Sequence, residues 1–579
     1  MALTHRPTRS FIHLALCLIV AAGFLAARPV PAAQAGSYDL YVNVAEDWLA
    51  DYQQCTEGWY GYEDCSLRGA INKANSDPTH RYTIHLKPLG QGEVYALIRP
   101  GTGEDGNLTG DLDITTNLAI YGNGATIDAN GIDRVIDFSA PAPGVDVYPA
   151  LIRDLTITGG HAPGGANGTA GNPDGGSGQN GGAIRIRNGE IRLVAVTVAG
   201  NQAGAGGNGR DGLGVYEGTG ENGGKGGTGG SGGGIYVAST GRLRTDTCRV
   251  LDNHAGTGGA GGEGGWGTEG HDAPGNGGRG GDGGMAGYGG GVYAETGSYV
   301  LLERTNFEHN TAGGGGNGGR GGDGSMGSDI VNGGNGGPGG HGGIGGSGGA
   351  VYAATLDVSH SLYFAENAAG KAGDGGAGGR AGVGRYDGAD GATQAGSKGG
   401  LGGAILADDV SDLKLNFTTI VYNTTGSHGT GFVPATGQFF GGGISARGLV
   451  ALKNSIVYFN TAAGTSSPDN CHRYYSEEVQ YTGGHNLLQA ADGCEFEPIE
   501  SSTPGDIIGR DPRLATDQTP PEPWMAPIAL QPGSPAIDQI PAAECIDWDT
   551  QGYSVTTDHW KQGRPSGFAC DIGAYEFPF

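Results

Sequence analysis

The sequence predicts an all-β protein, a right-handed single-stranded parallel β-helix whose long glycine-rich loops project from one side. The main observation is a unit that occurs six times, with a Gly-Gly-(Ala/Gly)-(Ile/Val) start and a (Val/Phe/Ile)-x-x-Asn end. A unit this short cannot bury a core alone, so its copies must stack. The starts lie at Gly181, Gly232, Gly289, Gly348, Gly402 and Gly441, and the ends at Asn201, Asn253, Asn310, Asn367, Asn423 and Asn460.

Apolar columns appear when the six units are superposed on their final Asn. Apolar and polar residues alternate along each unit, which predicts half-buried strands that pair in parallel and in register with the next unit. The stacked Asn side chains are expected to hydrogen-bond from coil to coil, and the glycine starts to adopt a positive φ. The column three residues before the Asn contains Val198, Val250, Phe307, Phe364, Ile420 and Val457.

Glycine-rich segments precede the first unit and separate the six units. Many read as Gly-Gly-x triplets, and a three-residue period suits extended helices of the polyproline II kind. We expect each loop to run out and back as two such helices that hydrogen-bond to the loops of adjacent coils; disorder is the alternative. The segments are 163–180, 204–231, 256–288, 313–347, 371–401 and 427–440.

Residues 1–35 have the pattern of an export signal, with basic residues, an apolar run and an Ala33-Gln34-Ala35 cleavage site. The signal contains three arginines and no acid, so the mature chain is more acidic than the formal net charge of −27. This charge excludes nucleic acid as a partner, disfavours anionic membranes and predicts no membrane insertion. We expect an extracellular protein, secreted or peripherally attached to the cell surface.

Seven cysteines follow the signal, and six of them form local pairs. In an exported protein such pairs predict disulfides. Cys248 is left over inside a repeat, where an inert buried thiol is expected and a reactive one is the alternative. The pairs are Cys55 with Cys65, Cys471 with Cys494, and Cys545 with Cys570.

Both ends of the mature chain contain family-like motifs. Residues 64–71, DCSLRGAI, resemble the motif of the CSLREA domain of exported bacterial proteins, and the match continues through 100–105, 110–114 and 131–135. Residues 509–512, 532–538, 564–565 and 570–577 resemble the domain called choice-of-anchor Q. These resemblances imply a pectate-lyase-like β-helix and no reaction. We expect an N-terminal cap over 37–110, the β-helix over 111–490 and the second domain over 491–579.

The repeats also resemble the polymorphic outer-membrane proteins, which are β-helical adhesins. No series of ten-residue alternating strands follows the solenoid, so we expect the chain to depart from that class. The resemblance nevertheless implies adhesion as a function for this type of solenoid.

Two polar columns are the candidate catalytic residues, because β-helix polysaccharide enzymes use carboxylates from neighbouring coils. The alternative is that these columns belong to an ordinary solvated face of an acidic protein. No cofactor or metal is expected; residues 277–282 and 318–323, GGRGGD, resemble part of a calcium-binding nonapeptide and leave calcium as an alternative. The columns contain Asp246, Glu303 and His360, and Asp252, His309 and Glu366.

The sequence therefore predicts a non-enzymatic surface or extracellular protein for adhesion, carbohydrate contact or matrix structure. Its partners would be polysaccharides or the surface of a host or neighbouring cell. The alternative is a lyase or glycoside hydrolase acting on an acidic polysaccharide. A third reading is binding of ice or a mineral by a flat glycine side.

Overall fold

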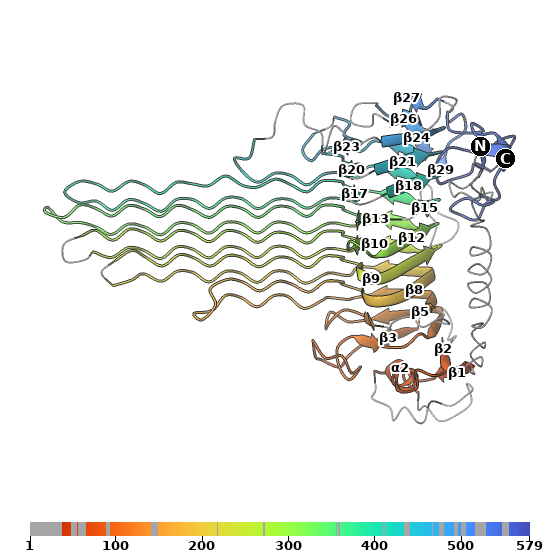
Figure 1. Ribbon diagram of the computed structural model, residues 1–579, viewed down its shortest axis with the longest axis horizontal. Helices are drawn as coiled ribbons and strands as arrows, with labels where there is room; N and C mark the ends of the chain where they lie inside the picture. The colour runs from red at the N-terminus through yellow and green to blue at the C-terminus, as the bar shows by residue number, and fades with distance from the viewer. Residues whose placement is uncertain are drawn as a thin grey trace, which may run out of the picture.

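The computed structural model describes residues 37–47, 55, 65–87, 93–139, 149–216, 218–269, 273–354, 356, 359–408, 412–433, 440–447, 449–465, 467–473, 480–490, 496–498, 505–515, 529–546 and 555–578. The expected export signal and Cys494 lie outside the described residues. The chain is a parallel β-helix from which the glycine-rich loops project together to one side (Figure 1). No helix among the described residues is long and apolar enough to cross a membrane.

A short helix closes the N-terminal end of the solenoid. Helix α2 (Leu67–Ser76) starts where the Ser66 side chain accepts a hydrogen bond from Gly69 N, at 3.1 Å. Its face of Leu67, Ala70, Ile71 and Ala74 is buried against the first strands. The helix thus covers the open end of the core.

Three ladders of parallel strands form the faces of the solenoid. The first ladder consists of β4 (Leu112–Ile114), β6 (Ile136–Ser139), the start of β8 (Ile184–Ala199), the start of β9 (Ile235–Asp246), β11 (Val292–Ala294), β14 (Val351–Ala353), β17 (Ile405–Ala407), β20 (Ile444–Ala446) and β23 (Cys471–Arg473).

The second ladder faces away from the loops. It consists of β1 (Ser37–Val42), β2 (Arg81–Leu86), β5 (Ala119–Asp128), β7 (Ala150–Thr158), parts of β8 and β9, β12 (Tyr299–Glu303), β15 (Ser359–His360), β18 (Asp412–Asn416), β21 (Leu449–Lys453), β24 (Gln480–Gly484) and β26 (Phe496–Pro498).

The third ladder ends at the stacked Asn residues. It consists of β3 (Val94–Ala96), the ends of β5, β7 and β8, β10 (Arg249–Leu251), β13 (Asn306–Glu308), β16 (Tyr363–Ala365), β19 (Thr419–Val421), β22 (Ile456–Tyr458), β25 (Leu487–Leu488) and β27 (Ile507–Ile508).

The predicted apolar columns pair in register and fill the interior. In the third ladder Val250 pairs with Phe307, Phe307 with Phe364 and Phe364 with Ile420. All four side chains are at most 1% exposed, and the two phenylalanine rings stack with centroids 4.9 Å apart. Each such buried side chain stabilises the fold by about 1.5–3 kcal/mol. The predicted strand register is confirmed.

The six Asn residues form a continuous buried ladder. Asn253 Nδ2 donates to Asn310 Oδ1 at 3.0 Å, and Asn310 Nδ2 donates to Asn367 Oδ1 at 3.0 Å. Each amide also donates to a backbone carbonyl, such as that of Val250. The residue before each Asn has a positive φ, for example 56° at His309. The glycine starts have positive φ as predicted, for example 71° at Gly232.

The glycine loops run out and back as extended arms in two layers, which we call the glycine bundle. Outgoing arms pair with outgoing arms: Gly258 N donates to Gly314 O at 2.8 Å, and the bond recurs at every third residue. Return arms pair in the same way, and bonds such as Gly259 N to Gly227 O, 2.8 Å, join the layers. This three-residue repeat confirms the predicted out-and-back path (Figure 1).

Close packing of backbone on backbone explains why two residues of each triplet are glycine. A Cβ on Gly259 would overlap the carbonyl oxygen of Gly207, and one on Gly258 would overlap that of Gly284. Only the third residue of a triplet points out of the bundle. These arms therefore gain stability from hydrogen bonds in place of a side-chain core.

Outward Asn and Asp side chains satisfy the backbone groups that the triplets leave open. Asn208 Oδ1 accepts from Ala260 N at 2.9 Å, and Asp323 Oδ1 accepts from Arg380 N at 2.7 Å. The return layer repeats the arrangement, with Asp282 Oδ1 accepting from His341 N at 3.0 Å. The polar third residues are thus part of the bundle's hydrogen-bond network.

The C-terminal region packs on the outside of the third ladder. Its apolar residues Leu530, Ile540 and Ile572 form a second core with Tyr363 and Ile456 of the ladder. The short strands β28 (Leu514–Ala515) and β29 (Ala529–Leu530) pair antiparallel, and a 3-10 turn η2 (Ala542–Glu544) follows. This packing covers the outer face of β16, β19 and β22.

Two of the predicted disulfides are present, Cys55–Cys65 and Cys545–Cys570. Cys471 is also disulfide-bonded. Cys248 is a free, buried cysteine, and burial raises the pKa of its thiol to about 12. The expectation of an inert thiol agrees with this environment.

Candidate functional site

The first candidate column lies on the second ladder, on three consecutive coils. Asp246 pairs with Glu303, and Glu303 with His360. His360 Nε2 lies 3.2 Å from Glu303 Oε1, and this hydrogen bond lowers the pKa of the Glu303 carboxyl. Asp246 accepts from Arg304 Nη2 at 2.7 Å. Both acids are therefore held as partnered carboxylates.

The second candidate column lies in the turn before the Asn ladder. His309 Nε2 lies 3.0 Å from Glu366 Oε2, and its Nδ1 lies 4.0 Å from Asp252 Oδ1. All three side chains are more than half exposed. Each residue has a φ between 50° and 56°. The column consists of turn residues beside the exit of the glycine loops.

A third cluster, which the sequence reasoning missed, lies where the C-terminal region meets the third ladder. Glu308 is 6% exposed, and burial raises the pKa of its carboxyl. Arg249 Nη2 lies 3.8 Å from Glu308 Oε1, and Asn306 Nδ2 donates to the same oxygen at 3.1 Å. Asn306 Oδ1 and the Tyr363 hydroxyl are buried without a hydrogen-bond partner. In the sequence, Glu308 is the one acid in an otherwise apolar column two residues before the Asn, and this was the signal that could have located the cluster.

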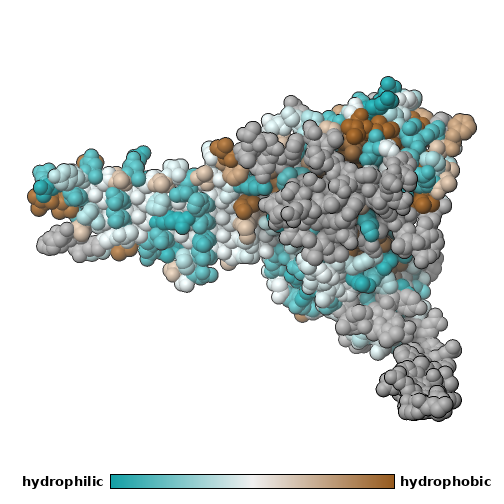
Figure 2. Space-filling model, turned by 45° about the horizontal axis from the view of Figure 1, so that its top comes forward, coloured by the Kyte–Doolittle hydropathy of each residue, from teal (hydrophilic) through white to brown (hydrophobic). Residues whose placement is uncertain are grey.

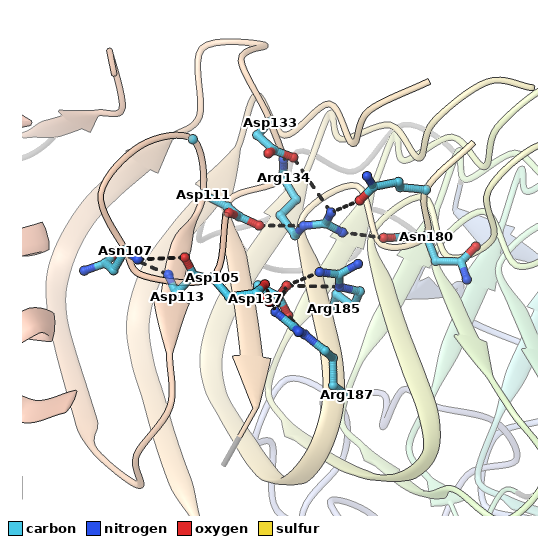
Figure 3. Close-up of polar contacts among 12 residues, drawn as sticks. Asp105, Asn107, Asp111, Asp113, Asp133, Arg134, Asp137, Asn180, Arg185 and Arg187 are labelled. Carbon is cyan, nitrogen blue, oxygen red and sulfur yellow. Dashed lines mark hydrogen bonds and ion pairs between the residues drawn. The ribbon is translucent and has the colours of Figure 1, made fainter. Parts of the chain in front are cut away.

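An acidic cluster lies in the N-terminal coils (Figure 3). Carboxylate oxygens of Asp105, Asp113 and Asp137 lie within 4.8 Å of one another, a spacing that can hold a metal ion. Arg187 donates to Asp137 at 2.6 Å and also to Asp105, and Arg185 donates to Asp137. These guanidinium groups already supply the positive charge that an ion would bring.

Other N-terminal acids form buried ion pairs. Arg134 Nε donates to Asp111 Oδ2 at 2.6 Å, and Arg134 Nη2 lies 3.9 Å from Asp133 Oδ1 (Figure 3). Arg68 is likewise buried and donates to Asp47 at 2.6 Å. The Arg134–Asp111 pair joins successive coils, and the Arg68–Asp47 pair joins helix α2 to the segment that follows β1.

The two GGRGGD segments lie in the glycine bundle. Asp282 is paired with Arg279 at 2.5 Å, and Asp323 with Arg320. Both aspartates also accept from a backbone N–H of the next arm. Their role in this arrangement is to cap neighbouring arms.

The outer faces of the bundle consist of the third residues of the triplets. Adjacent outgoing arms place Asp211, Glu263 and Arg320 in one row, and Trp266, Asp323 and Arg380 in another. Hydrophilic side chains cross the bundle as separate stripes (Figure 2). The ice or mineral reading assumed a flat glycine side. In the structure the paired glycines lie between the arms, and the outward positions hold mixed residues, from Ala260 and Gly314 to Asn208, Glu263 and Arg320.

Comparison with family models and with curated proteins gives no match. The resemblances to the CSLREA and choice-of-anchor Q domains therefore stay predictions. Among solved structures, the chain matches an antifreeze protein of the springtail Granisotoma rainieri, described as a bundle of nine polyproline type II helices whose crystal waters match the ice lattice. The identity is 22% over 41% of this chain and 93% of that chain, with a TM-score of 0.13. A likeness at this TM-score establishes neither a fold nor a function for this chain.

Proposed function

We propose that the protein is a non-enzymatic extracellular adhesion protein that presents the glycine bundle to another surface. The observation that carries the proposal is that all the loops leave the same side of the solenoid and join into one hydrogen-bonded body. Ordering the backbone of these loops costs about 1–2 kcal/mol per residue in conformational entropy. The arms add nothing to the solenoid core, so their order serves the surface that they present.

Two features support an extracellular location of the protein. Disulfides form and persist in oxidising compartments, and Cys55–Cys65 and Cys545–Cys570 are both bridged. The N-terminal residues also have the composition of an export signal.

The paired state of the candidate acids supports a role without catalysis. A general acid needs a raised pKa, whereas the hydrogen bond from His360 lowers the pKa of Glu303. Asp246 is held by Arg304. Neither acid of the first column is arranged as a proton donor.

The proposal is tested with beads coated with the full chain and applied to bacterial and eukaryotic cells. A Gly259→Ala/Gly319→Ala variant places two methyl groups on carbonyl oxygens inside the bundle, and we expect it to reduce bead adhesion several-fold. The matched control is Gly314→Ala, where the nearest atom to a new Cβ is 3.7 Å away. Equal adhesion by all three proteins would contradict the proposal.

The second candidate function is hydrolysis of an acidic polysaccharide, favoured by the Glu308 cluster. A carboxyl whose pKa burial raises can remain protonated and donate its proton to a leaving oxygen, and Arg249 offsets only part of this rise. Release of reducing ends from uronate polysaccharides, abolished by Glu308→Gln and kept by Glu303→Gln, would establish this activity. The absence of any product from all three proteins would eliminate it.

A further inference from the structure

Exposed hydrophobic side chains gather at the distal end of the glycine bundle. Seventeen large hydrophobic side chains are exposed among the described residues, and eight of them belong to the tips of four loops. Figure 2 shows a hydrophobic patch at the far end of the bundle, beside hydrophilic side chains. The eight, with their exposed fractions, are Leu213 56%, Val215 37%, Tyr216 87%, Trp266 62%, Met326 65%, Ile330 82%, Val383 58% and Tyr386 66%.

The tips are held in place by the same bonds that build the arms. Gly327 N donates to Val383 O at 2.7 Å, and Gly333 N donates to Tyr386 O at 2.8 Å. The Trp266 indole lies so close to Gly214 that a Cβ there would overlap it. The apolar side chains are therefore presented by neighbouring, mutually bonded loops.

We propose that these eight residues, the apolar tip, bind the surface of a zwitterionic lipid bilayer. The proposal rests on the proposed function, since it names the partner of the presented bundle. Tryptophan, tyrosine and aliphatic side chains on a polar support are the composition that settles at a lipid interface. The contact is peripheral, and the tip residues reach only the headgroup and upper acyl region.

The shape of the end favours a fluid lipid surface over a second copy of this chain. The middle loops reach farthest from the solenoid, so the end is rounded (Figure 1). Two rounded ends would touch over too little area for a stable dimer, which needs about 1,200–2,000 Å² in total. Lipid molecules, in contrast, can close around each inserted side chain.

The charge near the apolar tip favours a zwitterionic bilayer over an anionic one. The loops beside the tip carry both signs: Arg380 follows Asp323 in one row, and Arg385 stands 5.6 Å from the Tyr386 ring. The whole chain has a formal net charge of −27. An anionic bilayer would be repelled, so the partner is a zwitterionic surface bound by apolar contact.

The test is co-sedimentation of the full chain with phosphatidylcholine vesicles. We expect binding that persists at high salt, because salt does not weaken apolar burial. The variant Tyr216→Ser/Trp266→Ser/Ile330→Ser/Tyr386→Ser should lower the partition coefficient at least tenfold. The control is Val433→Ser/Phe568→Ser, which removes two hydrophobic side chains exposed by 84% and 96% outside the apolar tip.

Each other outcome overturns the inference. Absence of vesicle binding by the parent chain, or equal binding by the tip variant, removes the lipid partner. Binding that requires phosphatidylglycerol and disappears with salt indicates an electrostatic contact instead. A dimer in sedimentation velocity runs that only the tip variant loses indicates a second copy. If beads adhere to cells while vesicles do not bind, the proposed function survives and this inference does not.

Discussion

The side-chain amide of Asn310 donates to Asn367 Oδ1 on the next coil at 3.0 Å and to Val250 O on the previous coil at 2.7 Å. One buried side chain thus joins three successive turns of the solenoid. It is 0% exposed, so no water can replace either bond.

Replacing Asn310 by Leu should therefore destabilise the solenoid. Unpaired buried partners each cost about 1–3 kcal/mol, so we expect a loss on the order of 3 kcal/mol in the free energy of unfolding. Urea denaturation followed by intrinsic fluorescence measures it. The control is His309→Asn, since Asn tolerates the positive φ of this exposed neighbour. Equal stability of the two variants would show that the ladder adds nothing.

The glycine bundle should be locally fragile to a single methyl group. Gly259→Ala pushes a Cβ into the Gly207 carbonyl and should break the bonds joining the arms there. We expect amide exchange over residues 256–265 to accelerate at least tenfold while β10 and β13 keep their protection. Exchange in Gly314→Ala should match the parent chain, because its new Cβ has free space.

Cys248 should resist thiol reagents in the folded protein. The residue is 2% exposed, and burial raises the pKa of its thiol to about 12, so almost no thiolate exists at pH 8. Titration with a chromogenic disulfide should show no reaction of Cys248 until the chain is unfolded in guanidinium. Rapid reaction of the native protein, lost in Cys248→Ala, would contradict this.

Stability of the N-terminal coils should fall as the pH rises from 5 to 8. Burial raises the pKa of Asp113 from its ordinary 3.8 to about 7, so the folded state binds this proton more tightly than the unfolded chain. Above the unfolded pKa the unfolded chain has already lost the proton, and deprotonating the folded state removes stability. We expect a loss on the order of 2 kcal/mol.

The pH effect is measured from urea midpoints at the two pH values. Asp113→Asn should reduce the dependence, because it removes this titrating carboxyl while its amide oxygen can still accept the 2.9 Å hydrogen bond from Asn107 N. The slope that remains belongs to Asp111, whose pKa burial also raises to about 7. An unchanged slope in this variant would assign the titration to another group.

The solenoid was predictable because its unit repeats. Six copies of one pattern gave the strand register, the Asn ladder and the glycine starts, since each column must be buried in every coil. The loop path followed from the three-residue glycine period. The Asn and Asp caps did not, because a triplet read alone does not reveal which neighbouring arm it meets.

The candidate site was less predictable, for two physical reasons. Asp252, His309 and Glu366 share a column, but the column is set by a turn with positive φ, as Tyr422 and Phe459 in the same position show. The Glu308 cluster depends on the C-terminal region, whose His559 contacts Ser361 O at 2.8 Å across 198 residues of sequence. No local pattern reports such a contact.

The triplet construction of the bundle also governs how its reach can change by insertion and deletion. One added residue would rotate the rest of an arm by a third of a turn and drive side chains into the carbonyls between the layers. The length of an arm can therefore change only by whole triplets of about 9 Å. The outgoing and the return arm of a loop must each gain or lose the same number of triplets. The distance between the solenoid and the far end of the bundle therefore takes only discrete values.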